Sequence, residues 1–183
     1  PTVALRKKYI LRGLYISTFY LAITCGIKLF ALHQFKNALQ QQNIAYTNLI
    51  VKPTAFNCIL WNANIATEDA YLLADYSLLD TQPITFQRYQ KNNHLTQQPT
   101  GNPDFETLKQ ASEGWFIITQ KHNQYHFNDL RFGLLNADAK QPQFAFSYVF
   151  KNQNGTLKAH EVPKQKRDGK ALMKGIFQRI RGN

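Results

Sequence analysis

The sequence predicts an α+β protein in which a membrane-type N-terminal helix leads into a twisted antiparallel sheet domain with one or two covering helices. Three observations carry this prediction. Residues 9–32 are almost entirely apolar, several short stretches of alternating apolar and polar residues follow, and residues 164–183 are strongly basic. We therefore expect a membrane helix and stalk over 1–42, an antiparallel α+β domain over 43–163, and a basic amphipathic C-terminal helix over 164–183.

The apolar run predicts a membrane-spanning helix, because residues 14–27 contain no charged side chain while Arg12 and Lys28 lie near its ends. A helix of about 24 residues rises about 36 Å, which covers a hydrocarbon core of about 30 Å when the end cations reach the headgroups. The alternative is a long amphipathic helix that packs on the sheet. Residues 35–42 are expected to continue the helix as a polar stalk.

The cations around this run predict its orientation. Arg6, Lys7, Lys8 and Arg12 precede it, whereas only Lys28 and Lys36 follow closely. Lys and Arg are retained on the cytoplasmic side, so we expect the domain after the helix to be extracytoplasmic. The chain begins with Pro1 rather than Met, and we expect it to be a fragment or a processed product.

Alternating residues predict between six and eight strands in one antiparallel sheet. We expect them at 44–52, 58–66, 70–79, 84–89, 115–121, 125–135, 143–150 and 156–162. A loop over 92–103 and a short helix that begins at Asp104 and ends before Gly114 separate the two halves. We interpret the tryptophans and the aromatic run at 144–150 as sheet core, rather than as a platform for stacking single-stranded nucleic acid.

Four short motifs suggest a family. They are P-T-x-F-N-x-x-L-W from Pro53, Y-S-L-L-D ending at Asp80, D-L-R-F-G at 129–133, and the last residues, 177–183. Together they resemble the C-terminal part of the membrane-bound metal-dependent hydrolases, also called LexA-binding, inner membrane-associated hydrolases. The resemblance implies a multi-spanning parent protein of the bacterial inner membrane.

In that family the metal-ligand motifs of His and acidic residues belong to upstream membrane segments, and nothing in residues 1–183 matches them. The resemblance therefore implies an accessory domain with no catalytic residue and no cofactor of its own, a divalent metal in the parent protein, and the upstream segments as partners. The competing hypothesis is a non-enzymatic, membrane-anchored scaffold or assembly domain of the cell envelope.

A metal site within the chain has one candidate set. His122, His126 and Asp129 carry ligands suited to zinc or iron. The two histidines flank a tight turn, however, and their neighbours are ordinary solvated turn residues, so we interpret the set as structural. Cys25 and Cys58 provide neither a disulfide framework nor a cysteine zinc site.

Four polar residues are candidate contacts for a substrate or partner. Asp129 and Arg131 share a strand face, and we expect a structural ion pair between them in preference to a binding role. Asn57 and Asp80 have no evident structural role in the sequence.

The C-terminal segment combines seven cations with one acid and with apolar residues at helical spacing. Such a helix suits an anionic membrane surface, whereas the alternative is a helix docked on its own sheet. A net charge of +11 fits an anionic partner. We expect membrane lipid rather than nucleic acid, since nothing else in the chain reads bases. The expected lipid contacts are Lys170, Lys174, Phe177, Arg179 and Arg181.

Overall fold

The computed structural model describes residues 3–97, 99–134, 143–153, 155–163 and 169–182, with side chains from Leu5 and, in the last helix, from Met173 onward. The elements in chain order are α1 (Val3–Gln41), β1 (Asn48–Pro53), β2 (Leu60–Ala66), β3 (Ala70–Ser77), β4 (Gln87–Gln90), α2 (Asn93–Thr96), α3 (Pro103–Ala111), β5 (Phe116–Lys121), β6 (Gln124–Leu134), β7 (Phe144–Gln153), β8 (Thr156–Glu161) and α4 (Gly169–Ile180). The α+β class is confirmed, and a strand forms at every predicted position.

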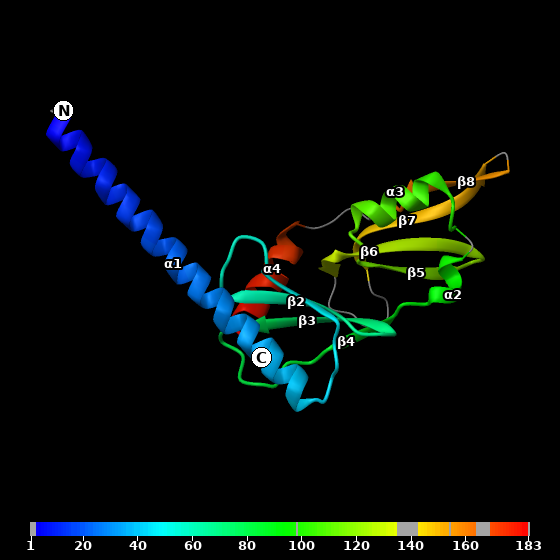
Figure 1. Cartoon of the computed structure of the whole chain (residues 1–183), viewed down its shortest axis with the longest axis horizontal. Helices are drawn as coiled ribbons and strands as arrows, with labels where there is room; N and C mark the ends of the chain where they lie inside the picture. Colours follow the sequence, from blue (N-terminus) through cyan, green and yellow to red (C-terminus); the bar gives the residue numbers. More distant parts are fainter. Residues whose placement is uncertain (1–2, 98, 135–142, 154, 164–168, 183) are drawn as a thin grey trace.

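The strands form two antiparallel sheets, ordered β1-β2-β3-β4 and β5-β6-β7-β8, instead of the single sheet that we expected. The connection from β4 to β5 carries α2 and α3, so β5 does not pair with β4 as a hairpin would. The expected loop over 92–103 accordingly contains a short helix. Figure 1 shows the second sheet lying beside the first, with α3 on its outer side.

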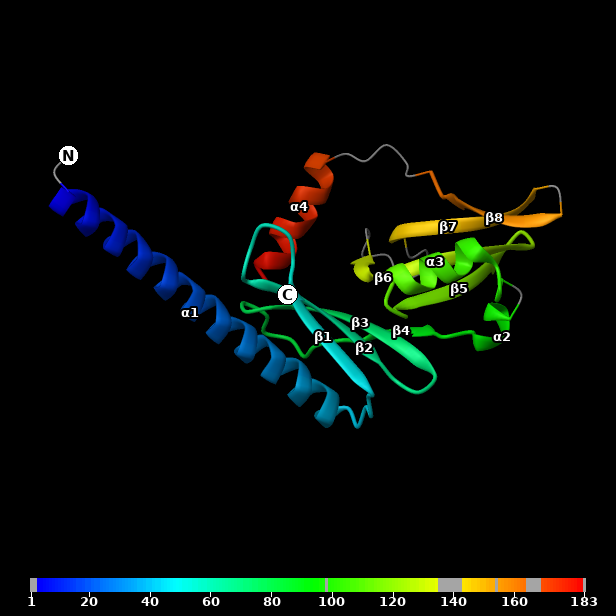
Figure 2. The ribbon, with the colours of Figure 1, turned by 45° about the horizontal axis from the view of Figure 1, so that its top comes forward.

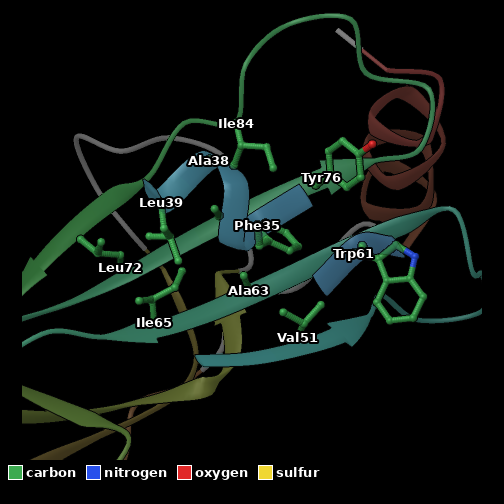
Figure 3. Close-up of a cluster of buried hydrophobic side chains, with 12 residues drawn as sticks. Phe35, Ala38, Leu39, Val51, Trp61, Ala63, Ile65, Leu72, Tyr76 and Ile84 are labelled. Carbon is green, nitrogen blue, oxygen red and sulfur yellow. The ribbon is translucent and has the colours of Figure 1, made fainter. Parts of the chain in front are cut away.

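Helix α1 packs on the first sheet only with the part that follows Gly26. Ala31, Phe35, Ala38 and Leu39 recur at helical spacing and are buried, and they lie over β1, β2 and β3 (Figure 3). The Phe35 ring meets the Tyr76 ring edge-on at 5.9 Å. Residues 35–41 continue the helix as predicted, but they are not the polar stalk that we expected, because this segment covers the core of the first sheet.

Two smaller cores hold the second sheet in place. Between the sheets, Ala66 packs with Trp115, Ile117 and Leu130, and the Asn64 amide donates a hydrogen bond to the Leu130 carbonyl at 2.9 Å. On the outer side, Phe105 of α3 meets the rings of Phe116, Phe127 and Phe150. The predicted structural role of the buried tryptophans and of Phe150 is confirmed.

The α1 packing predicts the stability of the first sheet. Phe35→Ala removes a fully buried ring and leaves a cavity, so we expect the free energy of unfolding to fall by about 3–5 kcal/mol. Guanidinium unfolding in detergent micelles, followed by tryptophan fluorescence, measures the change. Lys36→Ala is the matched control, since Lys36 is exposed one residue further along, and it should change stability by less than about 0.5 kcal/mol. Equal effects from both variants would contradict the packing.

Candidate functional site

The first part of α1 exposes apolar side chains on every side of the helix. The exposed positions include the consecutive triplets 9–11, 14–16 and 19–21, and three adjacent residues cover most of one helical turn. A surface of this kind suits a hydrocarbon environment rather than water. Within the described residues, α1 alone has the length and composition of a membrane span, which a membrane anchor and a signal sequence share.

Strand register shows which end of the first sheet faces this apolar segment. Pro53 pairs with Trp61, and Trp61 pairs with Tyr76, so these three residues form one row across the sheet. Phe35 contacts Tyr76 in that row. Helix α1 and β1 run in opposite directions along each other (Figure 2). The residues that follow Pro53 therefore lie level with the part of α1 that precedes Phe35. The β1–β2 loop, residues 54–59, therefore lies level with the exposed apolar segment, on the side of α4.

Phe56 is at the tip of this loop and is 95% exposed. Its φ of 61° lies in the left-handed region, which costs an aromatic residue energy relative to glycine or asparagine. A strained backbone that holds a large apolar side chain in solvent is a recognised mark of a functional position.

Asn57 holds the loop in this conformation. Its side-chain oxygen accepts hydrogen bonds from the backbone amides of Ile59 and Leu60 at 3.0 and 2.7 Å. Its amide donates to the Thr54 hydroxyl at 2.7 Å and to the Ala55 carbonyl. Asn57 thus has a structural role, which the sequence did not indicate, and its side chain cannot contact a partner without giving up these bonds.

Asp80 also has a structural role, because it fixes the C-terminal helix. Its carboxylate accepts hydrogen bonds from the Arg179 guanidinium at 2.5 and 2.6 Å and from the Ser77 backbone amide at 2.8 Å. Arg179 donates further to the Asp75 carbonyl, and the Ser77 hydroxyl donates to the Ile180 carbonyl. The Asp80 side chain is only 3% exposed. These bonds, which we call the α4 latch, hold α4 at the same end of the sheet as the β1–β2 loop.

The α4 latch corrects the expected role of Arg179. We expected a lipid contact, but its guanidinium is turned toward the sheet and bonded there. The expected contacts Lys174, Phe177 and Arg181 do lie together on the outer side of α4, where with Met173 and Gln178 they line an open depression of about 540 Å³. The side chain of Lys170 lies outside the described residues.

Asp129 and Arg131 form the expected ion pair. The Asp129 carboxylate accepts bonds from the Arg131 backbone amide and guanidinium, both at 2.8 Å, and it raises the pKa of Arg131. Burial lowers the pKa of nearby Lys52, whose ammonium lies over the Phe132 ring at 5.9 Å. The hydrogen-bonding capacity of the Asp129 carboxylate is taken up by Arg131. The pair stabilises the part of β6 where the strand register shifts.

The candidate metal ligands are not brought together. His122 forms the β5–β6 turn with Asn123, both at positive φ, and His126 and Asp129 lie three positions apart on β6, so they face opposite sides of the sheet. Burial and the nearby Lys121 lower the pKa of His126. Within the described ranges, no three His, Cys, Asp or Glu side chains cluster as metal ligands.

Sequence reasoning missed two exposed apolar residues at this end of the sheet, Phe56 and Leu79, which is 55% exposed. Both belong to the first two family motifs. The signal for Phe56 was its place between Pro53 and Asn57, two residues typical of turns. The missed latch partner Ser77 carried no signal of its own.

Comparisons with protein-family models, with curated proteins and with solved structures return no match. The fold and the site therefore define a class only. It is an α+β domain that carries one long apolar helix, of the kind found in membrane anchors and signal sequences, and presents a mixed apolar and cationic surface beside it.

The α4 latch generates a prediction about helix docking. Asp80→Asn removes the charge that binds Arg179. We therefore expect the free energy that holds α4 on the sheet to fall by about 1–3 kcal/mol, and the α4 amides to exchange hydrogen faster. Hydrogen exchange with mass spectrometry measures both. Glu106→Gln is the control, because its ion pair with Lys109 is long, at 3.9 Å, and solvent-exposed. Unchanged exchange in α4 of the Asp80→Asn protein would show that the latch does not hold the helix.

Proposed function

We propose that this chain is the C-terminal accessory domain of a membrane-bound metal-dependent hydrolase, anchored in the bacterial inner membrane by α1. The observation that carries the proposal is the continuous passage of α1 from an exposed apolar segment into the core of the domain. A domain built in this way is held at a fixed distance from the bilayer that contains the helix.

The packing of α1 favours an anchor over a cleaved signal sequence. Phe35 and Leu39 are fully buried, and they belong to the same unbroken helix as the exposed residues 5–23. Cleavage within the apolar segment would leave the core intact, but cleavage after it would remove the lid of the first sheet. If the helix is retained whole, the core keeps its cover and no cleavage site has to lie between the two parts.

The sidedness is part of the proposal. The N-terminal flank of α1 carries Arg6, Lys7, Lys8 and Arg12, so we place that flank in the cytoplasm and the sheets outside it. In this arrangement the domain lies on the extracytoplasmic face of the membrane.

The resemblance of four ordered motifs supports the hydrolase assignment. Two of them now have a physical basis, since the first builds the Phe56 loop around Asn57 and the second supplies Ser77 and Asp80 to the α4 latch. Neither forms a reaction centre. The proposed contribution of this domain is accessory, in shaping substrate access or assembly beside upstream membrane segments that hold the divalent metal.

The second candidate function is a non-enzymatic scaffold of the cell envelope. It is favoured by the roles of the polar candidates, because Asn57, Asp80, Asp129 and Arg131 are all bonded within the domain. The two proposals differ in the parent sequence before Pro1. Hydrophobic spans with His and acidic motifs support the hydrolase, whereas a short cytoplasmic tail supports the scaffold.

The orientation is tested by reporter fusions after Asn183. Alkaline phosphatase folds outside the cytoplasm and green fluorescent protein folds inside it, so we expect phosphatase activity without fluorescence. An Arg6, Lys7, Lys8, Arg12→Gln variant should weaken the preference, because it removes the cation excess. Fluorescence without phosphatase activity from the parent chain would place the domain in the cytoplasm.

The accessory role is tested by metal analysis of the purified chain. We expect zinc, manganese and iron at substoichiometric levels, because the proposed ligands belong to other segments. A chain carrying His122→Ala and His126→Ala is the control for adventitious binding by the turn histidines. Stoichiometric metal in the parent chain would contradict the accessory role, and its loss from the double variant would locate the metal at the turn histidines.

A further inference from the structure

Four large apolar side chains remain exposed at the end of the first sheet that faces the apolar part of α1. Phe56 is 95% exposed, Leu79 55%, Phe177 57% and Met173 39%. They come from the β1–β2 loop, the end of β3 and α4, which are distant in sequence. Figures 1 and 2 both place the β1–β2 loop beside α4. We call these four residues, with Lys174 and Arg181, the proximal surface.

The parts of this surface are held rigidly. Asn57 makes four hydrogen bonds that fix the loop around Phe56. The end of α4 lies close against the β3 end, since a Cβ on Gly182 would come within 2.4 Å of the Leu79 carbonyl oxygen. A strained backbone at Phe56 and the ion pair of Asp80 with Arg179 thus hold apolar side chains in solvent.

The two sides of α4 differ in a way that selects the partner. Along α4 and into the residue that follows it, Met173, Lys174, Phe177 and Arg181 are exposed and form one side, whereas Ile176, Arg179 and Ile180 are half-buried and form the other. The second side faces the sheet, where Arg179 is neutralised by Asp80. The outer side keeps two exposed cations next to two exposed apolar residues. Apolar groups bordered by cations match the headgroup region of an anionic bilayer.

We propose that the proximal surface is a second membrane contact, which docks on the anionic headgroup region of the same bilayer that α1 crosses. This inference rests on the proposed anchor. Phe56 and Phe177 enter the upper acyl region, and Lys174 and Arg181 bind lipid phosphates, with Lys28 of α1 at the same level. A single helix can tilt and rotate within the bilayer, and a domain that is rigidly attached to it moves with it. A second contact offset from α1 removes this freedom and holds the sheets at one orientation to the bilayer.

The test uses single tryptophans in the full chain, reconstituted into phosphatidylcholine vesicles that contain phosphatidylglycerol. Phe56→Trp reports on the proximal surface, and lipids brominated near the top of the acyl chains quench tryptophan on contact. Trp61 and Trp115 are buried and supply a background that the parent chain measures. We expect the Phe56→Trp protein to lose fluorescence in brominated vesicles relative to the parent.

Two further variants make the result specific. Tyr46→Trp is the matched control, because Tyr46 is a partly exposed aromatic residue at the opposite end of β1, before Asn48, and it should not be quenched. Phe19→Trp reports on the anchor, since Phe19 lies in the middle of the exposed apolar segment, and it should be quenched by lipids brominated deep in the chain. Quenching of Phe19→Trp without Phe56→Trp overturns the proximal surface while the anchor stands. Quenching of neither overturns both.

The charge dependence identifies the lipid. Removing phosphatidylglycerol, or introducing Lys174→Gln and Arg181→Gln, should lower the equilibrium constant for insertion of Phe56→Trp, by about fivefold for each cation lost. A second pair, Lys121→Gln and Lys151→Gln, removes exposed cations of the second sheet and should leave quenching unchanged. A blue-shifted but unquenched tryptophan at position 56 would show burial against protein, and it would overturn the lipid contact.

Discussion

The packing of the last third of α1 on the first sheet is the constraint on which the rest of the structure depends. Phe35 and Leu39 close the core over β1, β2 and β3, and the same helix continues without a break into an apolar segment that the described part of the chain leaves uncovered. One element therefore serves two environments. Since the helix is continuous, the position of the sheet relative to the apolar segment follows from the core itself.

This constraint also fixes where one end of the first sheet lies, namely the end beyond the row of Pro53, Trp61 and Tyr76. Whatever lies there is held near the surface of any bilayer that contains α1. The protein places three rigid features at that end: the Phe56 loop, the Leu79 end of β3 and the latched α4. Their exposed apolar side chains are costly in water, but they are reasonable next to lipid.

Local structure was largely predictable from the sequence, because alternation and turn residues act over a few positions. The strand at Ala70 began where expected, and the turn at His122 formed with two residues of positive φ. The division into two sheets was not predictable, since alternation reports which faces are buried and not which strands pair. The core role of Phe35 and Leu39 was hidden by the polar residues around them, Lys36, Asn37 and Gln40.

The candidate site was less predictable, because its parts meet only in the folded chain. Asp80 and Arg179 are separated by 99 positions, so neither residue revealed its partner, and Arg179 resembled the other cations of its helix. Phe56 was a motif residue whose exposure no periodicity could report. The ion pair of Asp129 and Arg131 was predicted correctly, because two residues on one strand face are near each other in any sheet.

The central claim, that one rigid helix joins the bilayer to the domain core, is tested most directly by a depth profile along α1. Single spin labels are placed in turn over residues 5–41 of a chain with Cys25 and Cys58 replaced by alanine, and their accessibility to oxygen and to a polar nickel complex is measured in bilayers. A continuous, rigid helix predicts lipid exposure on all sides up to about Gly26, followed by low accessibility to both reagents at positions 31, 35, 38 and 39. Nickel accessibility throughout residues 9–30, or high mobility at Phe35, would contradict it.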